Sequence, residues 1–507
     1  MGREVYGPGK ARLAARIRPV SLRGLAKHSA VYTVGNLAPK IGAFLLLPIY
    51  VRFLSQADYG AVALLTSFAG VLTVVYRLGL DGALMRMHFD VEGKAIGRLY
   101  STLTIFTIIV SVAGTLLLGL AIGPFFESLF AGTAFLPLGA LALALAMVGT
   151  LGYVSSVLFR ATGQAGRFLA LNLGAFIVSS IVSVVLIVVF EFGASGVLTG
   201  QLVGALGALG VTLVVISRLG GRLTPDLGVL REALKFGLPL VPHALAAWAL
   251  RLADRWLIAA FIMLPAPQVL AAIGAYSLGY QLGYLISMLA SSFNAAWTPY
   301  FFEIAKQPRG PRVYMHTITL VLAGLMSLAV GMSVLAEEIV AIIARPGYED
   351  AAGVLPIVAF ASVLQAAYIM FVGAVFLEKR TGSLAIITAM SASLNIVLNI
   401  VLIPRIGILG AAWATFASYA LFAVATYRLG SRLYPIQLDS PRLAATAGAA
   451  LAVLLISRIP VSDDVLLQGA FHLGLALLFA AFVAVMSVKP IRDLRASVAR
   501  DRTQTSS

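Results

Sequence analysis

Three ionisable residues lie close together within a long apolar stretch of this 507-residue chain. Arg251 and Arg255 are four residues apart and Asp254 follows Arg251 by three, so a helix places them on one face. Two cations and one anion leave a surplus positive charge for an anionic ligand, and arginine forks suit phosphate in particular. The alternative is a cluster that neutralises itself, with Arg255 reaching the outer headgroups of a membrane.

Two further cations lie in apolar surroundings near the start of the chain. Lys40 is about 11 residues into the first apolar stretch, or roughly 17 Å along a helix, which is too deep for snorkelling. Because an ionised group at that depth needs water or a partner, we favour a cavity-lining cation over a structural one. Arg77 lies near the inner end of the second stretch and, on position alone, could snorkel.

Other polar residues favour packing over chemistry. Asn395 and Asn399 are four apart, as expected of residues that bridge membrane helices. The chain has no cysteine, and no second ligand lies at metal spacing from its isolated histidines. We therefore expect no metal and no cofactor. Small residues predict close helix contacts at two places: Gly200, Gly204, Gly207 and Gly210, and Gly279 with Gly283.

The elements that position these charges are transmembrane helices. Apolar residues make up 60% of the chain and charged residues 11%, a balance that leaves no watery surface for a soluble protein. Runs of about 20 apolar residues cross a bilayer. We predict an all-α integral membrane protein with fourteen spans, near residues 29–54, 58–80, 99–123, 134–159, 168–190, 194–217, 236–262, 269–301, 313–336, 351–377, 383–404, 407–427, 441–457 and 465–488.

The distribution of charge predicts the orientation. Most of the 37 Lys and Arg residues fall on the segments that are cytoplasmic if both ends of the chain are inside. The predicted outer segments hold only four: Arg52, Arg345, Arg405 and Arg458. The net charge of +16 is therefore a topology signal and indicates no nucleic-acid partner.

An internal repeat predicts two lobes. At a shift of 214 residues, Gly60 falls on Gly274 and Gly196 on Gly410. Six spans per unit preserve orientation, so the lobes should be related by a pseudo-two-fold axis along the membrane normal. The predicted organisation is a basic cytoplasmic tail (1–28), an N-lobe (29–217), a cytoplasmic linker (218–235), a C-lobe (236–430), two additional spans (431–488) and a C-terminal tail (489–507).

Prolines interrupt the lead helix of each predicted lobe. Pro39 and Pro48 lie in the first span, and Pro239 and Pro242 in the seventh. Interrupted helices at matching places point to a binding site, so these prolines are candidate hinges, with simple packing as the alternative.

Several stretches resemble the bacterial polysaccharide flippase family of the multidrug/oligosaccharidyl-lipid/polysaccharide exporter superfamily. They are residues 394–412 (LNIVLNIVLIPRIGILGAA), 54–60 followed by Gly79-Leu80-Asp81, the Asp254-Arg255 pair, and Ala275-Tyr276 leading to Trp297-Thr298-Pro299. The resemblance covers spans one to twelve. Related lipid II flippases carry basic residues in helices one and two, which Lys40 and Arg77 resemble. This chain has Leu46 and Leu47 where those relatives have a further basic residue.

The resemblance implies transport of an undecaprenyl-diphosphate-linked oligosaccharide from the inner to the outer leaflet of the bacterial cytoplasmic membrane. Lys40, Arg77, Arg251 and Arg255 would bind the diphosphate, and Asp254 would orient an arginine or couple transport to H⁺ or Na⁺. Expected partners are membrane lipid and the glycosyltransferases and polymerase of the same pathway.

Three alternatives remain open. A cation-coupled multidrug antiporter should carry unpaired carboxylates in a lobe, and a lipid II flippase should carry the missing basic residue. A membrane glycosyltransferase or polymerase needs a sizeable outer loop, whereas the predicted outer loops are short.

The chain also has no Walker GxxxxGK[ST], HExxH or dinucleotide-binding motif, which excludes a pump driven by its own ATP hydrolysis. We therefore expect a secondary transporter, not an enzyme.

Overall fold

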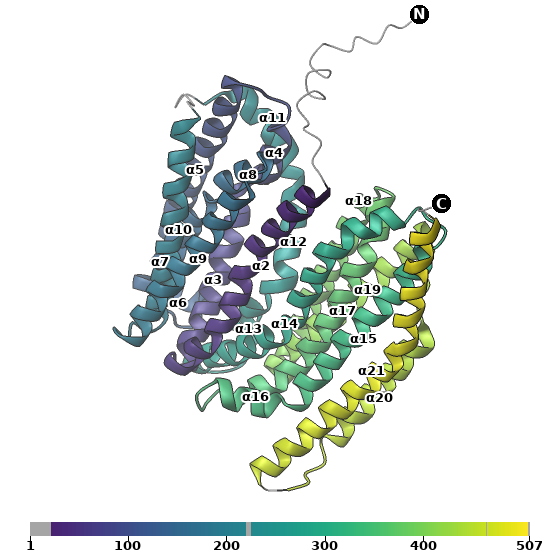
Figure 1. Cartoon of the computed structure of the whole chain (residues 1–507). Coiled ribbons are helices and arrows are strands. Elements are labelled where there is room, and N and C mark those ends of the chain that lie inside the picture. Colours follow the sequence, from purple (N-terminus) through teal and green to yellow (C-terminus); the bar gives the residue numbers. More distant parts are fainter. Residues whose placement is uncertain (1–21, 220–224, 463, 505–507) are drawn as a thin grey trace, which may run out of the picture.

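The computed structural model describes residues 22–219, 225–462 and 464–504, and every regular element in them is helical. The first half of the chain contains α2 (Leu22–Phe53), α3 (Gln56–Arg77), α4 (Leu80–Met87), α5 (Lys94–Ile122), η1 (Gly123–Phe125), α6 (Phe126–Leu129), η2 (Phe135–Gly139), α7 (Ala140–Thr150), α8 (Tyr153–Ala161), α9 (Ala165–Val188) and α10 (Gly193–Arg218). Figure 1 shows these helices as one bundle, coloured purple to teal.

The second half forms a second bundle, with α20 and α21 packed against α15 at its edge (Figure 1). Its elements are α11 (Leu227–Gly237), η3 (Leu238–Leu240), α12 (Val241–Leu252), α13 (Asp254–Phe261), α14 (Ala266–Ile304), α15 (Gly310–Val334), α16 (Ala336–Ile343), α17 (Ala351–Leu377), α18 (Thr381–Ile406), α19 (Ile408–Leu433), α20 (Ser440–Ile456) and α21 (Val465–Gln504). The helix α11 begins inside the predicted linker and ends two residues after it, and it packs against α4 of the first bundle.

Twelve segments of the described chain are long and apolar enough to cross a membrane. They coincide with twelve of the fourteen predicted spans. The other two predicted spans fall on α2 and on α20, which has only 17 residues, so the total of fourteen remains a prediction. The multi-pass α-helical architecture is confirmed.

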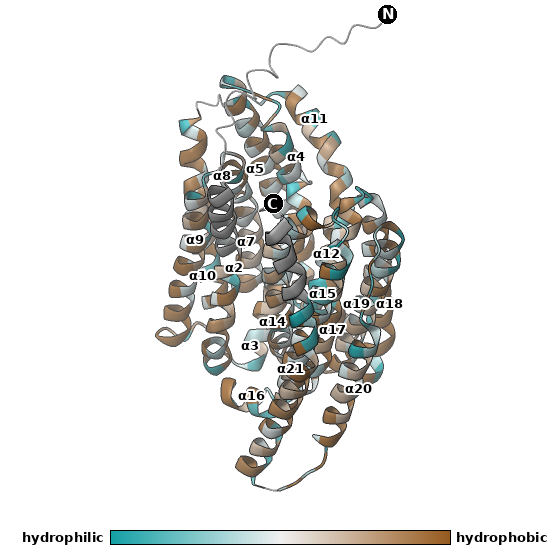
Figure 2. Cartoon of the chain, turned by 45° about the vertical axis from the view of Figure 1, so that its right-hand side comes forward, coloured by the Kyte–Doolittle hydropathy of each residue, from teal (hydrophilic) through white to brown (hydrophobic). Residues whose placement is uncertain are grey.

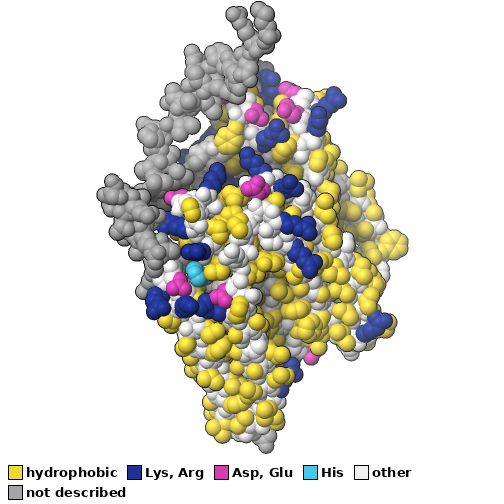
Figure 3. Space-filling view, turned by 90° about the vertical axis from the view of Figure 1, so that its right-hand side faces the viewer, with side chains coloured by type: hydrophobic (Ala, Val, Ile, Leu, Met, Phe, Trp, Pro, Cys, Tyr) yellow, Lys and Arg dark blue, Asp and Glu magenta, His cyan; other side chains and the backbone are white. Residues whose placement is uncertain are grey.

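The outer surface suits a lipid environment. Large apolar side chains are exposed along the helices, among them Leu116, Leu117 and Leu120 on α5, each more than 60% exposed. Figure 2 shows apolar residues along most helices. In Figure 3 the lower end of one face is covered mainly by apolar side chains, with Lys and Arg gathered above it. The start of α2 and the end of α21 lie toward this upper end (Figure 1).

The two bundles meet most closely where α3 crosses α14. A Cβ atom at Gly60 would lie 1.9 Å from the Leu270 carbonyl oxygen, and one at Gly274 would lie 2.1 Å from the Gln56 carbonyl oxygen. Only glycine lets the two backbones approach this closely. The glycines that the repeat pairs with each other therefore face one another across the crossing, although the two-fold axis itself remains a prediction.

Side chains from both bundles reinforce this junction. The guanidinium of Arg52, at the end of α2, donates to the carbonyl oxygens of Ile342 (2.6 Å) and Ile343 (3.3 Å). The Tyr348 hydroxyl donates to the Ser55 carbonyl oxygen at 3.1 Å. The predicted outer ends of both bundles are thus hydrogen-bonded to each other.

The crossing yields a stability prediction. Gly60→Ala should lower the free energy of unfolding by about 1–3 kcal/mol, because the methyl group has no space and the helices must separate. Gly324→Ala in α15 is the matched control: no atom lies within 4 Å of its Cβ position, so it should be neutral or stabilising. Thermal unfolding of the full chain in detergent measures both variants. An unchanged Tm for Gly60→Ala would contradict the close crossing.

Candidate functional site

Asp254 is the first residue of α13 and is fully buried. Its carboxylate accepts hydrogen bonds from the Tyr276 hydroxyl (2.5 Å), the Thr415 hydroxyl (2.9 Å) and the Asn399 side-chain amide (3.0 Å). These donors come from α14, α19 and α18. A buried carboxylate is stable only when such donors replace its water, so the site holds four helices together.

The two asparagines of α18 extend this site. The Asn399 amide also donates to the Asn395 carbonyl oxygen at 2.8 Å. Because Asn399 of α18 also donates to Asp254 of α13, the expected role of these residues in bridging helices is confirmed for Asn399. The Asn399 side-chain oxygen and the Asn395 amide nitrogen are buried without a hydrogen-bond partner. The cluster thus keeps unused polar capacity beside a carboxylate.

Arg255 is held by aromatic rings. It is 5% exposed, and its guanidinium carbon lies 4.3 Å from the centre of the Tyr280 ring and 5.2 Å from that of Tyr276. Its Nη1 donates to the Arg251 carbonyl oxygen at 2.9 Å. The alternative in which Arg255 reaches outer headgroups is wrong, because the folding of α13 against α14 buries the side chain. In the described chain it also forms no ion pair within 4 Å of Asp254.

Lys40 and Arg251 differ from Arg255 in that both are exposed. Within the described residues, neither side chain has a hydrogen-bond or ion-pair partner. Lys40 lies on α2, which packs against α9 and α14, and Arg251 lies in the last turn of α12, which packs against α3 and α18. Each of the two cations therefore lies on a helix that contacts the opposite bundle.

Arg77 ends α3 and is half-buried. Its guanidinium donates to the carbonyl oxygens of Gly149 (3.2 Å) and Thr150 (3.3 Å), and its carbon lies 5.6 Å from the centre of the Tyr153 ring. The predicted fourth span breaks between α7 and α8, which leaves the last carbonyls of α7 free to accept. Arg77 is thus bound by neutral groups and, among the described residues, forms no ion pair within 4 Å.

The prolines act differently in the two lead helices. Pro239 lies in the short 3₁₀ helix η3 and Pro242 in the first turn of α12, so the helix of the seventh span tightens to one 3₁₀ turn there without ending. By contrast, α2 continues through Pro39 and Pro48 without a break. The structure thus has a 3₁₀ turn at Pro239 and none at Pro39 or Pro48, and the hinge role of the four prolines remains a prediction.

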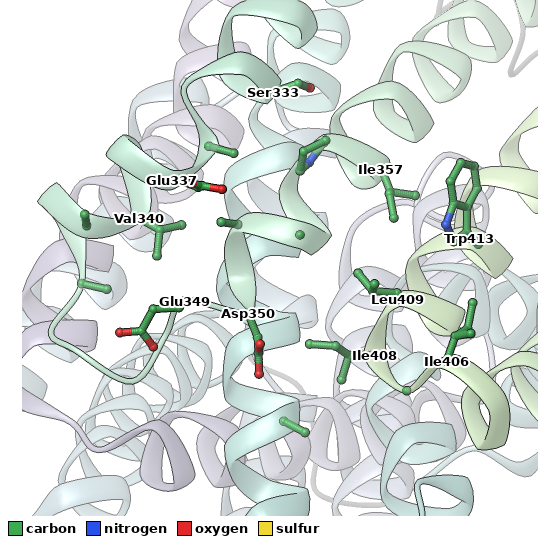
Figure 4. Close-up of a pocket in the computed structure, with 18 of the residues that line it drawn as sticks. Ser333, Glu337, Val340, Glu349, Asp350, Ile357, Ile406, Ile408, Leu409 and Trp413 are labelled. Atoms are coloured by element: carbon green, nitrogen blue, oxygen red, sulfur yellow. The ribbon is translucent and has the colours of Figure 1, made fainter. Parts of the chain in front are cut away.

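A hollow of about 1130 Å³ opens beside α16, α17 and the start of α19. Figure 4 shows Glu337 and Val340 on its α16 side and Leu409 and Trp413 on its α19 side.

The described residues include no group of three His, Cys, Asp or Glu that could hold a metal ion.

Some residues of the Asp254 site were not predicted. Tyr276 and Tyr280 are four apart in the sequence, and Tyr284 continues the stripe, a pattern that could have indicated a shared helix face. Thr415 carries no comparable signal, because its place beside Asp254 depends on the packing of α19 against α18.

Comparisons with known proteins agree with this architecture. The sequence model of the family described as "polysaccharide biosynthesis protein" matches residues 49–352, more than half of the chain. A Haemophilus influenzae protein of the Lsg locus is 24% identical over 291 residues, which is 56% of this chain and 67% of the relative.

Solved structures share the fold. The lipid II flippase MurJ in an inward closed conformation has a TM-score of 0.67 and 12% identity, covering 91% of this chain and 99% of that one. An inward-facing multidrug resistance transporter of the MATE family, in the MOP superfamily, has a TM-score of 0.57 and 16% identity, covering 79% and 94%. At these identities the likeness is one of fold.

The Asp254 site yields a second prediction. Asp254→Ala leaves up to three buried donors without an acceptor, at a cost of about 1–3 kcal/mol for each donor left unsatisfied. Asp254→Asn retains one acceptor oxygen and should lose less stability. Thermal unfolding of the two purified variants measures the difference, and equal Tm values for the wild-type protein and Asp254→Ala would refute the hydrogen-bond network.

Proposed function

Because the chain belongs to the polysaccharide biosynthesis protein family, we propose that it moves an undecaprenyl-diphosphate-linked oligosaccharide across the bacterial cytoplasmic membrane. The oligosaccharide passes from the inner to the outer leaflet by alternating access, while the polyprenyl chain stays in lipid. Enzymes that assemble surface polysaccharide supply the substrate and use the product. Both chain termini are cytoplasmic in this proposal, which the excess of Lys and Arg in the predicted inner segments supports.

One observation carries the proposal: Lys40 and Arg251 are exposed cations in the apolar part of the chain, with no partner among the described residues. A charge facing hydrocarbon costs at least about 2.5–3.5 kcal/mol, so such residues are retained where water or an anion meets them. One cation lies in each bundle. A diphosphate held between α2 and α12 would contact both.

Arg77 and Arg255 have a supporting role in this proposal. Their guanidiniums are already bound by carbonyl oxygens and tyrosine rings, which do not neutralise them. They therefore raise the positive potential around the substrate without direct contact. The net effect favours an anionic headgroup over a cationic drug.

Asp254 is the proposed coupling group. The carboxylate is fully buried, has no ion pair within 4 Å among the described residues, and lies beside the unpartnered side-chain oxygen of Asn399. A proton or Na⁺ at this carboxylate would neutralise it and change how α13 binds α14, α18 and α19. Because α12, which carries Arg251, directly precedes α13, ion binding at Asp254 would also change the position of Arg251.

We expect Lys40→Ala and Arg251→Ala each to reduce translocation of a headgroup-labelled, diphosphate-linked lipid in proteoliposomes by at least about tenfold, because each removes a charge-assisted phosphate contact. Lys40→Arg should retain most activity. Arg428→Ala, at an exposed cation of α19, is the matched control and should behave as wild type. Normal translocation by both Ala variants would refute the site, and efflux of a cationic dye by the wild-type protein would favour the multidrug alternative.

Coupling is tested by Asp254→Asn in the same vesicles. Wild-type translocation should respond to an imposed H⁺ or Na⁺ gradient, because ion binding changes the charge of the carboxylate. The amide cannot take up either ion in this way, so the variant should give the same rate with and without the gradient. A gradient response preserved in Asp254→Asn would place coupling elsewhere.

A further inference from the structure

A second cavity, of about 690 Å³, lies in the first bundle between α8, α9 and α10, away from Lys40 and Asp254. Figure 1 shows these three helices in the same bundle, and α10 packs against both α8 and α9. The cavity is lined mainly by apolar residues, and Gln164, Arg167 and Arg218 are its three polar ones.

The glycines of α10 explain why the cavity exists. A Cβ at Gly200 would lie 2.1 Å from the Ser183 hydroxyl, and one at Gly204 would lie 2.6 Å from the Ala175 carbonyl oxygen, so α9 and α10 touch there. At Gly207 and Gly210 no atom lies within 4 Å of the Cβ position. The prediction of close contact is thus confirmed for the first two glycines and wrong for the last two. Beyond Gly204 the helices diverge.

The cavity walls are apolar over about one leaflet. Gly207 and Arg218 are eleven residues apart on α10, or roughly 16 Å along its axis, close to half of a bilayer core of about 30 Å. Leu158 and Leu171 are buried at its base, whereas Val214 is 49% exposed. An acyl chain fits this length and chemistry.

Two arginines lie at the same end of the cavity. Arg167 is in the first turn of α9 and Arg218 is the last residue of α10, and both are exposed. Arg167 donates to the neutral side-chain oxygen of Gln164, and no lining residue is Asp or Glu. Among the described residues, neither arginine forms an ion pair within 4 Å. Two such cations at one end of an apolar slot complement a lipid phosphate and its acyl chain.

We propose that this cavity, the α8–α10 groove, is a binding site for an anionic glycerophospholipid of the leaflet at that end. The acyl chain lies along Gly207 and Gly210, and the headgroup phosphate binds Arg167 and Arg218. The site is separate from the proposed transport path and does not depend on the transported substrate.

Native mass spectrometry of the full chain in an equimolar mixture of dioleoyl phosphatidylglycerol and dioleoyl phosphatidylcholine tests the charge. The wild-type protein should retain phosphatidylglycerol preferentially. In the Arg167→Gln/Arg218→Gln variant, the ratio of retained phosphatidylglycerol to phosphatidylcholine should fall about 30-fold, because each cation near the membrane surface contributes about 1 kcal/mol. Arg428→Gln/Arg432→Gln, at two exposed cations of α19, is the matched control and should keep it.

A second variant tests the slot. Gly207→Leu/Gly210→Leu should fill the groove and reduce the retention of both lipids at least tenfold, with an unchanged or higher Tm. Gly174→Leu/Gly324→Leu changes two glycines that also have open space but lie outside the groove, and it should retain lipid as the wild type does. Equal retention of both lipids by the wild-type protein, or a preference that survives the double Arg variant, would overturn the proposal.

Discussion

An ionisable side chain inside a membrane needs a partner or water, and this constraint organises the protein. The chain meets it in different ways. Asp254 is surrounded by hydroxyl and amide donors from three other helices, and Arg255 lies against two tyrosine rings. Arg77 uses the free carbonyls at the break between α7 and α8. Lys40 and Arg251 have no such partner among the described residues, which is why they carry the functional proposal.

Much of the fold could be predicted from the sequence, because a bilayer leaves the backbone few choices. Apolar runs of the length needed to cross the hydrocarbon core must be helical, so each predicted span falls on a helix or a run of helices. Breaks within spans were harder to predict. A 3₁₀ turn accompanies Pro239, whereas α2 is helical through Pro39 and Pro48, since neighbouring groups can compensate for a lost hydrogen bond.

The candidate site was predictable only in part. Charge in an apolar run identified Asp254 and Arg255, but not whether they pair with each other. In the structure they form no ion pair within 4 Å and instead share Tyr276, whose hydroxyl donates to Asp254 and whose ring lies beside Arg255. Thr415 of α19 completes the contacts of Asp254, and Tyr280 completes those of Arg255. Similarly, the spacing of Gly200, Gly204, Gly207 and Gly210 suggests one uniform contact. Whether α9 follows α10 along its whole length depends on three-dimensional packing, which the glycine pattern alone does not encode.

The crossing of α3 and α14 has a consequence for any hydrated cargo. Where the backbones at Gly60 and Gly274 touch, no water molecule or sugar ring fits between the two helices. The hydrogen bonds of Arg52 and Tyr348 also join the two bundles at this junction. In the proposed transport cycle, passage of the headgroup at this crossing requires these backbone contacts to break, so their strength adds to the energy of opening the bundles there.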